Sequence, residues 1–153
     1  MKNILKFSGF IGAGLTLIAF ILIMATKAVY TDAGAIIGTT AIFGNGNASP
    51  VWAGLLAWIF ALVGLLGLLV VNVLPLVGVK ALDKFALIIN LCLGVLLVLA
   101  GVFCFIIVPA TVSGTLLEYA TPGIGAGWVI GGILFLAAGT LALCPSVFAL
   151  IKK

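Results

Sequence analysis

Carboxylates and imidazoles are the usual acid–base groups of an enzyme, and this chain of 153 residues has very few of them. It contains no histidine, so neither an imidazole base nor the commonest metal ligand is available. Its acidic residues are Asp32, Asp83 and Glu118, and their spacing joins none of them into a catalytic carboxylate pair. Asp32 and Glu118 could meet on one face of the protein. We expect them to be solvated loop charges or a partner for Lys27. The sequence therefore predicts a protein that is not an enzyme.

The spacing of the cysteines indicates neither redox nor metal chemistry. Cys92, Cys104 and Cys144 each lie inside a long hydrophobic stretch, and the sequence has no C-x-x-C pair and no metal-ligand spacing. Cysteines in such surroundings usually behave as small hydrophobic side chains. We therefore expect free thiols, with no metal and no cofactor.

The composition is that of an integral membrane protein. Hydrophobic residues make up 65% of the chain, charged residues make up 7%, and the mean hydropathy is +1.52. The net charge of +4 arises from lysines, because the chain has no arginine. These lysines are scattered in ones and twos and do not form a stripe that could follow nucleic-acid phosphates. Membrane lipids, and no nucleic acid, are therefore the expected surroundings.

Four hydrophobic stretches are long enough to cross a membrane, which takes about 20 apolar residues in a helix. None has a charged residue in its interior, and only helices pair all the backbone groups of a single span in lipid. The predicted fold is an all-α membrane protein, a four-transmembrane-helix bundle that forms one domain over residues 1–153. The spans are expected at about 7–26, 51–74, 85–108 and 127–151, with outer loops at 27–50 and 109–126 and an inner loop at 75–84.

The lysines predict the orientation of the chain. Six of the seven flank the spans on one side, and positively charged flanks stay in the cytoplasm. We therefore expect a multi-pass protein of the plasma membrane with both termini in the cytoplasm. The six residues are Lys2, Lys6, Lys80, Lys84, Lys152 and Lys153.

Small residues mark the helix faces that are suited to close packing. Helices already in lipid gain little from the hydrophobic effect, so association depends on close approach of their backbones. The fourth span has two small stripes, which indicates either one bundle alone or a spare face for another chain. The stripes are Gly54, Ala57, Ala61 and Gly64 in the second span, and Gly127, Gly131, Ala138 and Ala142, beside Gly132, Gly139 and Ser146, in the fourth.

Asn72 and Asn90 are the polar residues of most interest inside the spans. They lie near the cytoplasmic ends of successive spans that a short loop joins, so they could form an interhelical hydrogen bond of about 1 kcal/mol. The alternative is a role in binding a substrate. Ion and proton pathways usually carry an ionisable residue inside the bundle, and these spans have none, so we favour the structural pair.

The first outer loop carries an apolar, β-branched run. Residues 28–43 hold two short runs separated by Asp32, Ala33 and Gly34, a pattern typical of a β-hairpin. An isolated hairpin is marginal in water, so we expect a small extracellular β-hairpin or sheet that rests on the helix ends or on the second outer loop. The apolar residues of the two loops either form a lid on the bundle or dock a partner. These residues are Ile36, Ile37, Ile42, Phe43, Leu116, Leu117 and Tyr119.

Four spans with both ends inside, a longer first outer loop with predicted strands and a shorter second loop resemble the layout of claudin-type tetraspan proteins. The plan is also similar to that of small, lysine-rich four-span proteins of bacteria. The resemblance implies a helical bundle with a small extracellular sheet and a tendency towards side-by-side assembly. The claudin first loop carries a Trp-Gly-Leu-Trp signature and two cysteines, whereas this loop has no cysteine and only Trp52 at its end. A paracellular barrier function is therefore not implied.

These features predict a structural or accessory membrane protein that is not an enzyme. It would form a homo-oligomer or join another membrane protein through its small-residue helix faces and apolar outer loops. The alternative is an oligomeric pore or small-solute transport protein, such as a holin-like channel. A pore needs a continuous polar stripe along one helix, and no span provides one, so no small-molecule substrate is expected.

Overall fold

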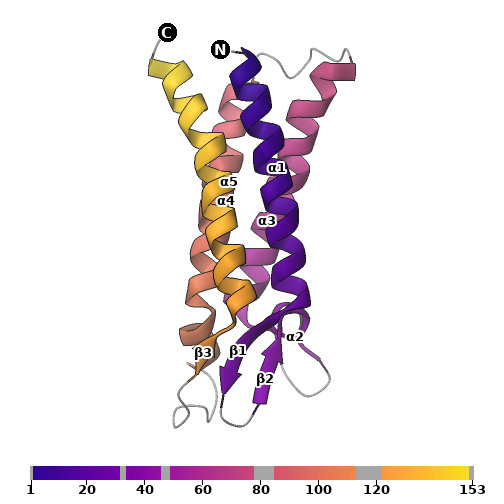
Figure 1. The fold of residues 1–153 in the computed structure, drawn as a ribbon, viewed down its shortest axis with the longest axis vertical. Helices are drawn as coiled ribbons and strands as arrows, with labels where there is room; N and C mark the ends of the chain where they lie inside the picture. Colours follow the sequence, from indigo (N-terminus) through magenta and orange to yellow (C-terminus); the bar gives the residue numbers. More distant parts are fainter. Residues whose placement is uncertain (1, 32–33, 46–48, 78–84, 113–121, 152–153) are drawn as a thin grey trace.

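The computed structural model describes residues 2–31, 34–45, 49–77, 85–112 and 122–151. Within these ranges the chain is mostly helical, with a small sheet and a short helix between the first two long helices (Figure 1). The elements in chain order are α1 (Lys2–Ala25), β1 (Lys27–Thr31), β2 (Gly34–Ile37), α2 (Gly38–Phe43), α3 (Trp52–Val73), the 3₁₀ turn η1 (Leu74–Val77), α4 (Ala86–Val112), β3 (Gly123–Ile124) and α5 (Ala126–Ile151).

Four of these helices are long and apolar enough to cross a membrane, at the four stretches that the sequence predicts as spans. Their apolar segments are Phe7–Ala25, Trp52–Val73, Ala86–Thr111 and Ala126–Ile151, with hydropathies from 2.2 to 3.1. The third segment extends beyond the predicted end at residue 108, and α4 continues through Pro109. A proline removes one backbone donor, but a membrane helix packed against neighbours tolerates that loss.

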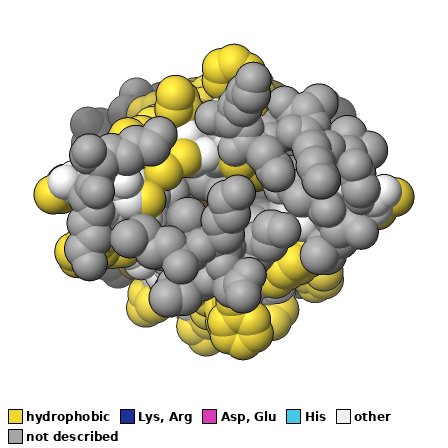
Figure 2. Space-filling view, turned by 90° about the horizontal axis from the view of Figure 1, so that it is seen from above, with side chains coloured by type: hydrophobic (Ala, Val, Ile, Leu, Met, Phe, Trp, Pro, Cys, Tyr) yellow, Lys and Arg dark blue, Asp and Glu magenta, His cyan; other side chains and the backbone are white. Residues whose placement is uncertain are grey.

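The four long helices form a ring in which each packs against two neighbours, in the order α1, α3, α4, α5. Successive long helices run in opposite directions, so both chain termini lie at one end of the bundle and the sheet and α2 lie at the other (Figure 1). We call these the terminal end and the sheet end. Figure 2 views the terminal end, where hydrophobic side chains form much of the visible rim of described residues.

The predicted hairpin is present as β1 and β2, and β3 extends it to a three-stranded sheet in the order β2-β1-β3. Both pairings are antiparallel: Tyr30 lies opposite Ala35 in β2 and opposite Gly123 in β3. The register shifts between Lys27 and Val29, which marks a bulge at the start of β1. The sheet therefore joins the segment after α1 to the segment before α5.

The second half of the predicted β-region is a helix instead of a strand. Residues 38–43 form α2, although threonine and isoleucine there favour strands. The Gly38 N–H donates to the Thr26 carbonyl oxygen over 2.8 Å, and the Val51 N–H donates to the Ala41 carbonyl oxygen over 2.8 Å. These bonds tie α2 to the ends of α1 and α3, so tertiary contacts override the local preference.

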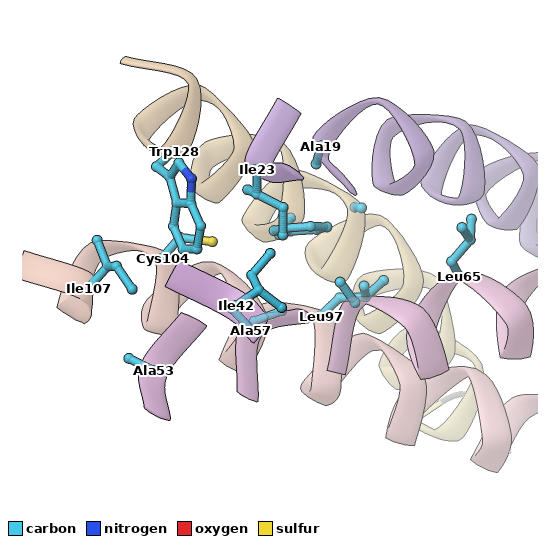
Figure 3. Packing of buried hydrophobic residues seen from close by; sticks show 14 of the residues in the cluster. Ala19, Ile23, Ile42, Ala53, Ala57, Leu65, Leu97, Cys104, Ile107 and Trp128 are labelled. Carbon is cyan, nitrogen blue, oxygen red and sulfur yellow. The ribbon is translucent and has the colours of Figure 1, made fainter. Parts of the chain in front are cut away.

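The apolar core runs through the ring and continues beneath the sheet. Figure 3 shows side chains from α1, α2, α3, α4 and α5 meeting there. Trp128, Ile23 and Ile42 are fully buried, as is Val29 of β1. Burial of these large side chains from separate elements holds the sheet and α2 against the bundle.

Candidate functional site

Both small-residue stripes of α5 are occupied within the chain. One stripe faces α1, since a Cβ placed on Gly131 would lie 2.8 Å from Ile23 Cγ2 and one on Gly12 would lie 3.4 Å from the Ala138 carbonyl oxygen. The other faces α4, since a Cβ on Gly139 would lie 2.8 Å from the Gly94 carbonyl oxygen. The spare face suggested by the sequence is therefore filled by neighbouring helices. The buried members of these stripes are Gly127, Gly131, Gly132, Ala138, Gly139, Ala142 and Ser146.

The stripe of α3 is also used within the bundle. Gly54, Ala57, Ala61 and Gly64 are all buried. Gly54 approaches the Ala41 carbonyl oxygen of α2, and Gly64 packs against the Leu97 side chain of α4. No small-residue face assigned to assembly from the sequence is left exposed.

The two buried asparagines do not form the predicted interhelical pair. Asn72 Nδ2 donates to the Leu68 carbonyl oxygen of its own helix over 2.7 Å. Its amide lies against Gly9 of α1, where the absence of a side chain leaves room for it. Asn90 Oδ1 is buried without a hydrogen-bond partner. The sequence placed both residues near one end of the bundle but could not show that Asn72 turns towards α1 instead of α4.

The apolar loop residues have different positions. Ile42 is fully buried and Ile36 is half-buried, so both help to dock the sheet and α2 on the bundle. Ile37 and Phe43 are exposed by 51% and 49%. Leu116, Leu117 and Tyr119 lie outside the described residues. The first loop therefore has both residues that pack on the bundle and residues that are exposed, at different positions.

The hairpin has an inner and an outer face. Val29 pairs with Ile36 on the face that turns towards the core, where Val29 is fully buried. Tyr30 pairs with Ala35, and both are exposed on the opposite face. Ile37 adds an exposed β-branched side chain at the end of β2. We call Tyr30, Ala35 and Ile37 the outer hairpin face.

Lys27 provides the charge beside this face. Its Nζ lies 5.5 Å from the centroid of the Tyr30 ring, within the range of a cation–π contact. In the sheet order β2-β1-β3, β2 is an outer strand of the described sheet. The sheet end therefore combines an apolar face, one stacked cation and a strand edge.

Aromatic rings surround the sheet end of α3. Phe43 meets Trp58 edge-on with ring centroids 5.1 Å apart, and Trp52 meets Phe103 edge-on at 5.9 Å. Trp58 also packs beside Phe20 at 6.0 Å, so it is a packing residue between α1, α2 and α3. Trp52 remains 51% exposed at the start of α3.

Groups able to do chemistry do not converge in the described part of the chain. It contains no group of three or more His, Cys, Asp or Glu side chains placed to hold a metal ion. Cys104 is buried, whereas Cys92 and Cys144 are exposed on their helices, and all three are free thiols. The outer hairpin face is thus the best-formed candidate site, and its chemistry is that of contact.

Comparisons with protein-family models, curated proteins and solved structures find no match.

Sequence reasoning named Ile37 and Phe43 but missed the exposed aromatic residues Tyr30 and Trp52. The strand register is what brings Tyr30 onto the same face as Ala35, and a prediction of hairpin strands without their pairing does not provide it.

Proposed function

We propose that this protein is a structural or accessory subunit of the membrane that associates with another copy of itself through the outer hairpin face and the edge of β2. The observation that carries the proposal is the two-faced hairpin, with Val29 in the core and Tyr30 and Ile37 exposed. Exposed strand edges pair readily with other strands, and apolar side chains beside them add buried area. A second hairpin in an antiparallel arrangement would satisfy both.

The small-residue helix faces are less suited to binding a second copy than the sheet end. Their small residues are buried against neighbours in the same chain, so close helix–helix contact with a partner would have to displace an existing one. The sheet end needs no such displacement. Association there leaves the bundle intact.

The apolar core does not favour the alternative function of a pore. Leu68, Leu97 and Phe135 come from α3, α4 and α5, and each is fully buried inside the ring. A pore through one copy would need polar groups along its path, and these buried side chains are apolar. We therefore retain assembly as the proposed function.

Replacing Ile37 by lysine tests the proposed contact. Ile37 is half exposed, so the monomer should fold, but pairing would bury the new charge in an apolar contact. We expect the apparent dimer dissociation constant to rise by about tenfold or more, which corresponds to 1.4 kcal/mol. Native mass spectrometry from lipid nanodiscs would follow the fraction of species heavier than one 15.6 kDa chain.

Thr39→Lys is the matched control, because Thr39 is exposed at the same end on α2 but lies off the strand. It adds the same charge and should leave the mass distribution unchanged. A wild-type protein that is monomeric at every concentration would overturn the proposal. Equal dissociation by both variants would show that charge, and not the strand edge, controls association.

We further propose that the sheet end faces outwards and the terminal end faces the cytoplasm, because six of the seven lysines flank the terminal end of the spans. Ala35→Cys should react with a membrane-impermeant maleimide in intact cells. Val77→Cys, at a position 73% exposed in η1, should react only after the membrane is permeabilised. A background variant lacking Cys92 and Cys144 sets the baseline. Labelling of both positions in intact cells would contradict the orientation.

A further inference from the structure

A layer of buried polar side chains crosses the bundle near its terminal end. Asn72 is the next-to-last residue of α3, Asn90 is the fifth residue of α4, and Ser146 lies five residues before the end of α5. Their exposed fractions are 3%, 5% and 0%. We call these three residues the polar layer.

The helix contacts place these residues at nearly the same level. A Cβ on Gly94 of α4 would lie 2.7 Å from Leu143 Cγ of α5. One turn closer to the terminal end, the same two helices carry Asn90 and Ser146. Gly67 of α3 packs against Leu93 of α4, and the next turn in that direction leads to Asn72 and Asn90. Three neighbouring helices therefore each contribute one polar side chain to this layer.

Donors and acceptors are unbalanced within the layer. Ser146 Oγ donates to the Ala142 carbonyl oxygen over 2.8 Å, and Asn72 Nδ2 donates to the Leu68 carbonyl oxygen. The Ser146 hydroxyl hydrogen and one N–H of the Asn72 amide are therefore used on their own helices. Asn90 Oδ1 is buried and accepts no hydrogen bond. A buried amide oxygen without a donor costs free energy, so a site of this kind favours a ligand that supplies one.

The ligand should be small and neutral. A cation would have to be buried where the described spanning segments contain no acidic residue to balance its charge, and burial of an unpaired charge is far more costly than burial of a hydroxyl. Asn90 lies only about 6 Å along the helix from the start of α4, from the rise of 1.5 Å per residue. Asn72 and Ser146 also lie within about two turns of the ends of α3 and α5, so the layer is near the terminal end of the bundle (Figure 1).

We propose that the polar layer binds a hydroxyl group, which donates its hydrogen to Asn90 Oδ1 beside the contact between α4 and α5. The hydroxyl belongs either to a water molecule or to a lipid headgroup that reaches between the helix ends. The site does not depend on the outer hairpin face, so it stands whether or not the protein self-associates.

Solid-state NMR on the full-length protein in bilayers tests the site, with isotope labels in asparagine and alanine. In one arm, magnetisation is transferred from water protons in deuterated lipid, and in the other it is transferred from lipid protons in deuterated water. Ala100 is the internal control, because it is fully buried in the same helix. Asn90→Leu removes the acceptor and identifies the Asn90 signal by its loss.

We expect the Asn90 side chain to receive magnetisation faster than the Ala100 methyl group in at least one arm. Fast transfer from water identifies a water molecule, and fast transfer from lipid alone identifies a lipid hydroxyl. Transfer to Asn90 that is no faster than transfer to Ala100 in both arms would overturn the proposal.

Discussion

Gly139→Ala should destabilise the bundle by about 1–3 kcal/mol, the usual cost of forcing an extra methyl group into a packed interior. The added Cβ would lie 2.7 Å from Val98 Cγ2, 2.8 Å from the Gly94 carbonyl oxygen and 2.9 Å from the Val98 nitrogen. Two of these atoms belong to the backbone of α4, so a rotamer change cannot relieve the contact. The helices must separate, and their separation loses the packing that holds them together in lipid.

Gly14→Ala is the matched control for this experiment. Gly14 is an exposed glycine within α1, and a Cβ placed on it meets no atom within 4 Å. The same chemical change should therefore alter stability by no more than about 0.5 kcal/mol. Unfolding in a mixed-micelle titration with sodium dodecyl sulfate, followed by circular dichroism, compares the two variants. Equal midpoints for both would show that α4 and α5 are not in tight backbone contact.

Gly131→Ala separates the two stripes of α5. Its Cβ would lie 2.8 Å from Ile23 Cγ2, a side-chain methyl group in α1, and 3.4 Å from the Ala19 carbonyl oxygen. Because its tight contact is with one side chain, whereas Gly139 also meets the backbone of α4 within 3 Å, the Gly131 stripe should tolerate substitution better than the Gly139 stripe. The contact between α4 and α5 is therefore the less adaptable of the two.

The sequence was sufficient to predict the helices and the hairpin but not their neighbours. Each span is a long apolar segment without internal charge, and length and hydropathy identify such segments reliably. The hairpin is predicted by the β-branched runs on either side of residues 32–34, which lie close together in the sequence. Both features depend on residues close together in the chain.

The sequence did not predict which neighbouring helix each helix face contacts. Periodicity shows that Gly132 and Gly139 share a stripe, but it does not show which helix covers that stripe. The second stripe of α5 suggested a partner chain, whereas α4 fills it. The same limit applies to Asn72, whose amide occupies the space beside Gly9 on a helix far away in sequence.

The helix α2 could not be predicted because its stability arises from contacts outside its six residues. A helix of this length is unstable alone, and its threonines and isoleucine favour strands. Hydrogen bonds from Gly38 to α1 and from Val51 to Ala41 fix it in place. Local propensity therefore indicated a strand at a position where the tertiary structure requires a helix.

Gly38→Ala should release α2 from the bundle and cost about 3 kcal/mol, at the upper end of ordinary single substitutions. A Cβ on Gly38 would overlap the Ile23 carbonyl oxygen and would lie 3.0 Å from the Thr26 carbonyl oxygen, which accepts the Gly38 N–H bond. Relief requires α2 to move away from the end of α1. That movement withdraws Ile42 from the core and weakens the bond between the Val51 N–H and Ala41.

Hydrogen exchange measured by mass spectrometry in nanodiscs reports this release directly, because the Val51 amide should exchange faster in Gly38→Ala than in the wild type. Thr39→Ala is the control: it adds no new side-chain atoms at an exposed position of the same helix, and Val51 should stay protected. Protection at Val51 that survives in Gly38→Ala would mean that α2 does not depend on close approach to α1. In that case the outer hairpin face, which α2 helps to hold against the bundle, would need another explanation for its rigidity. Loss of protection at Val51, with the core amides of α4 unchanged, would instead establish α2 as the element that couples the sheet to the membrane helices.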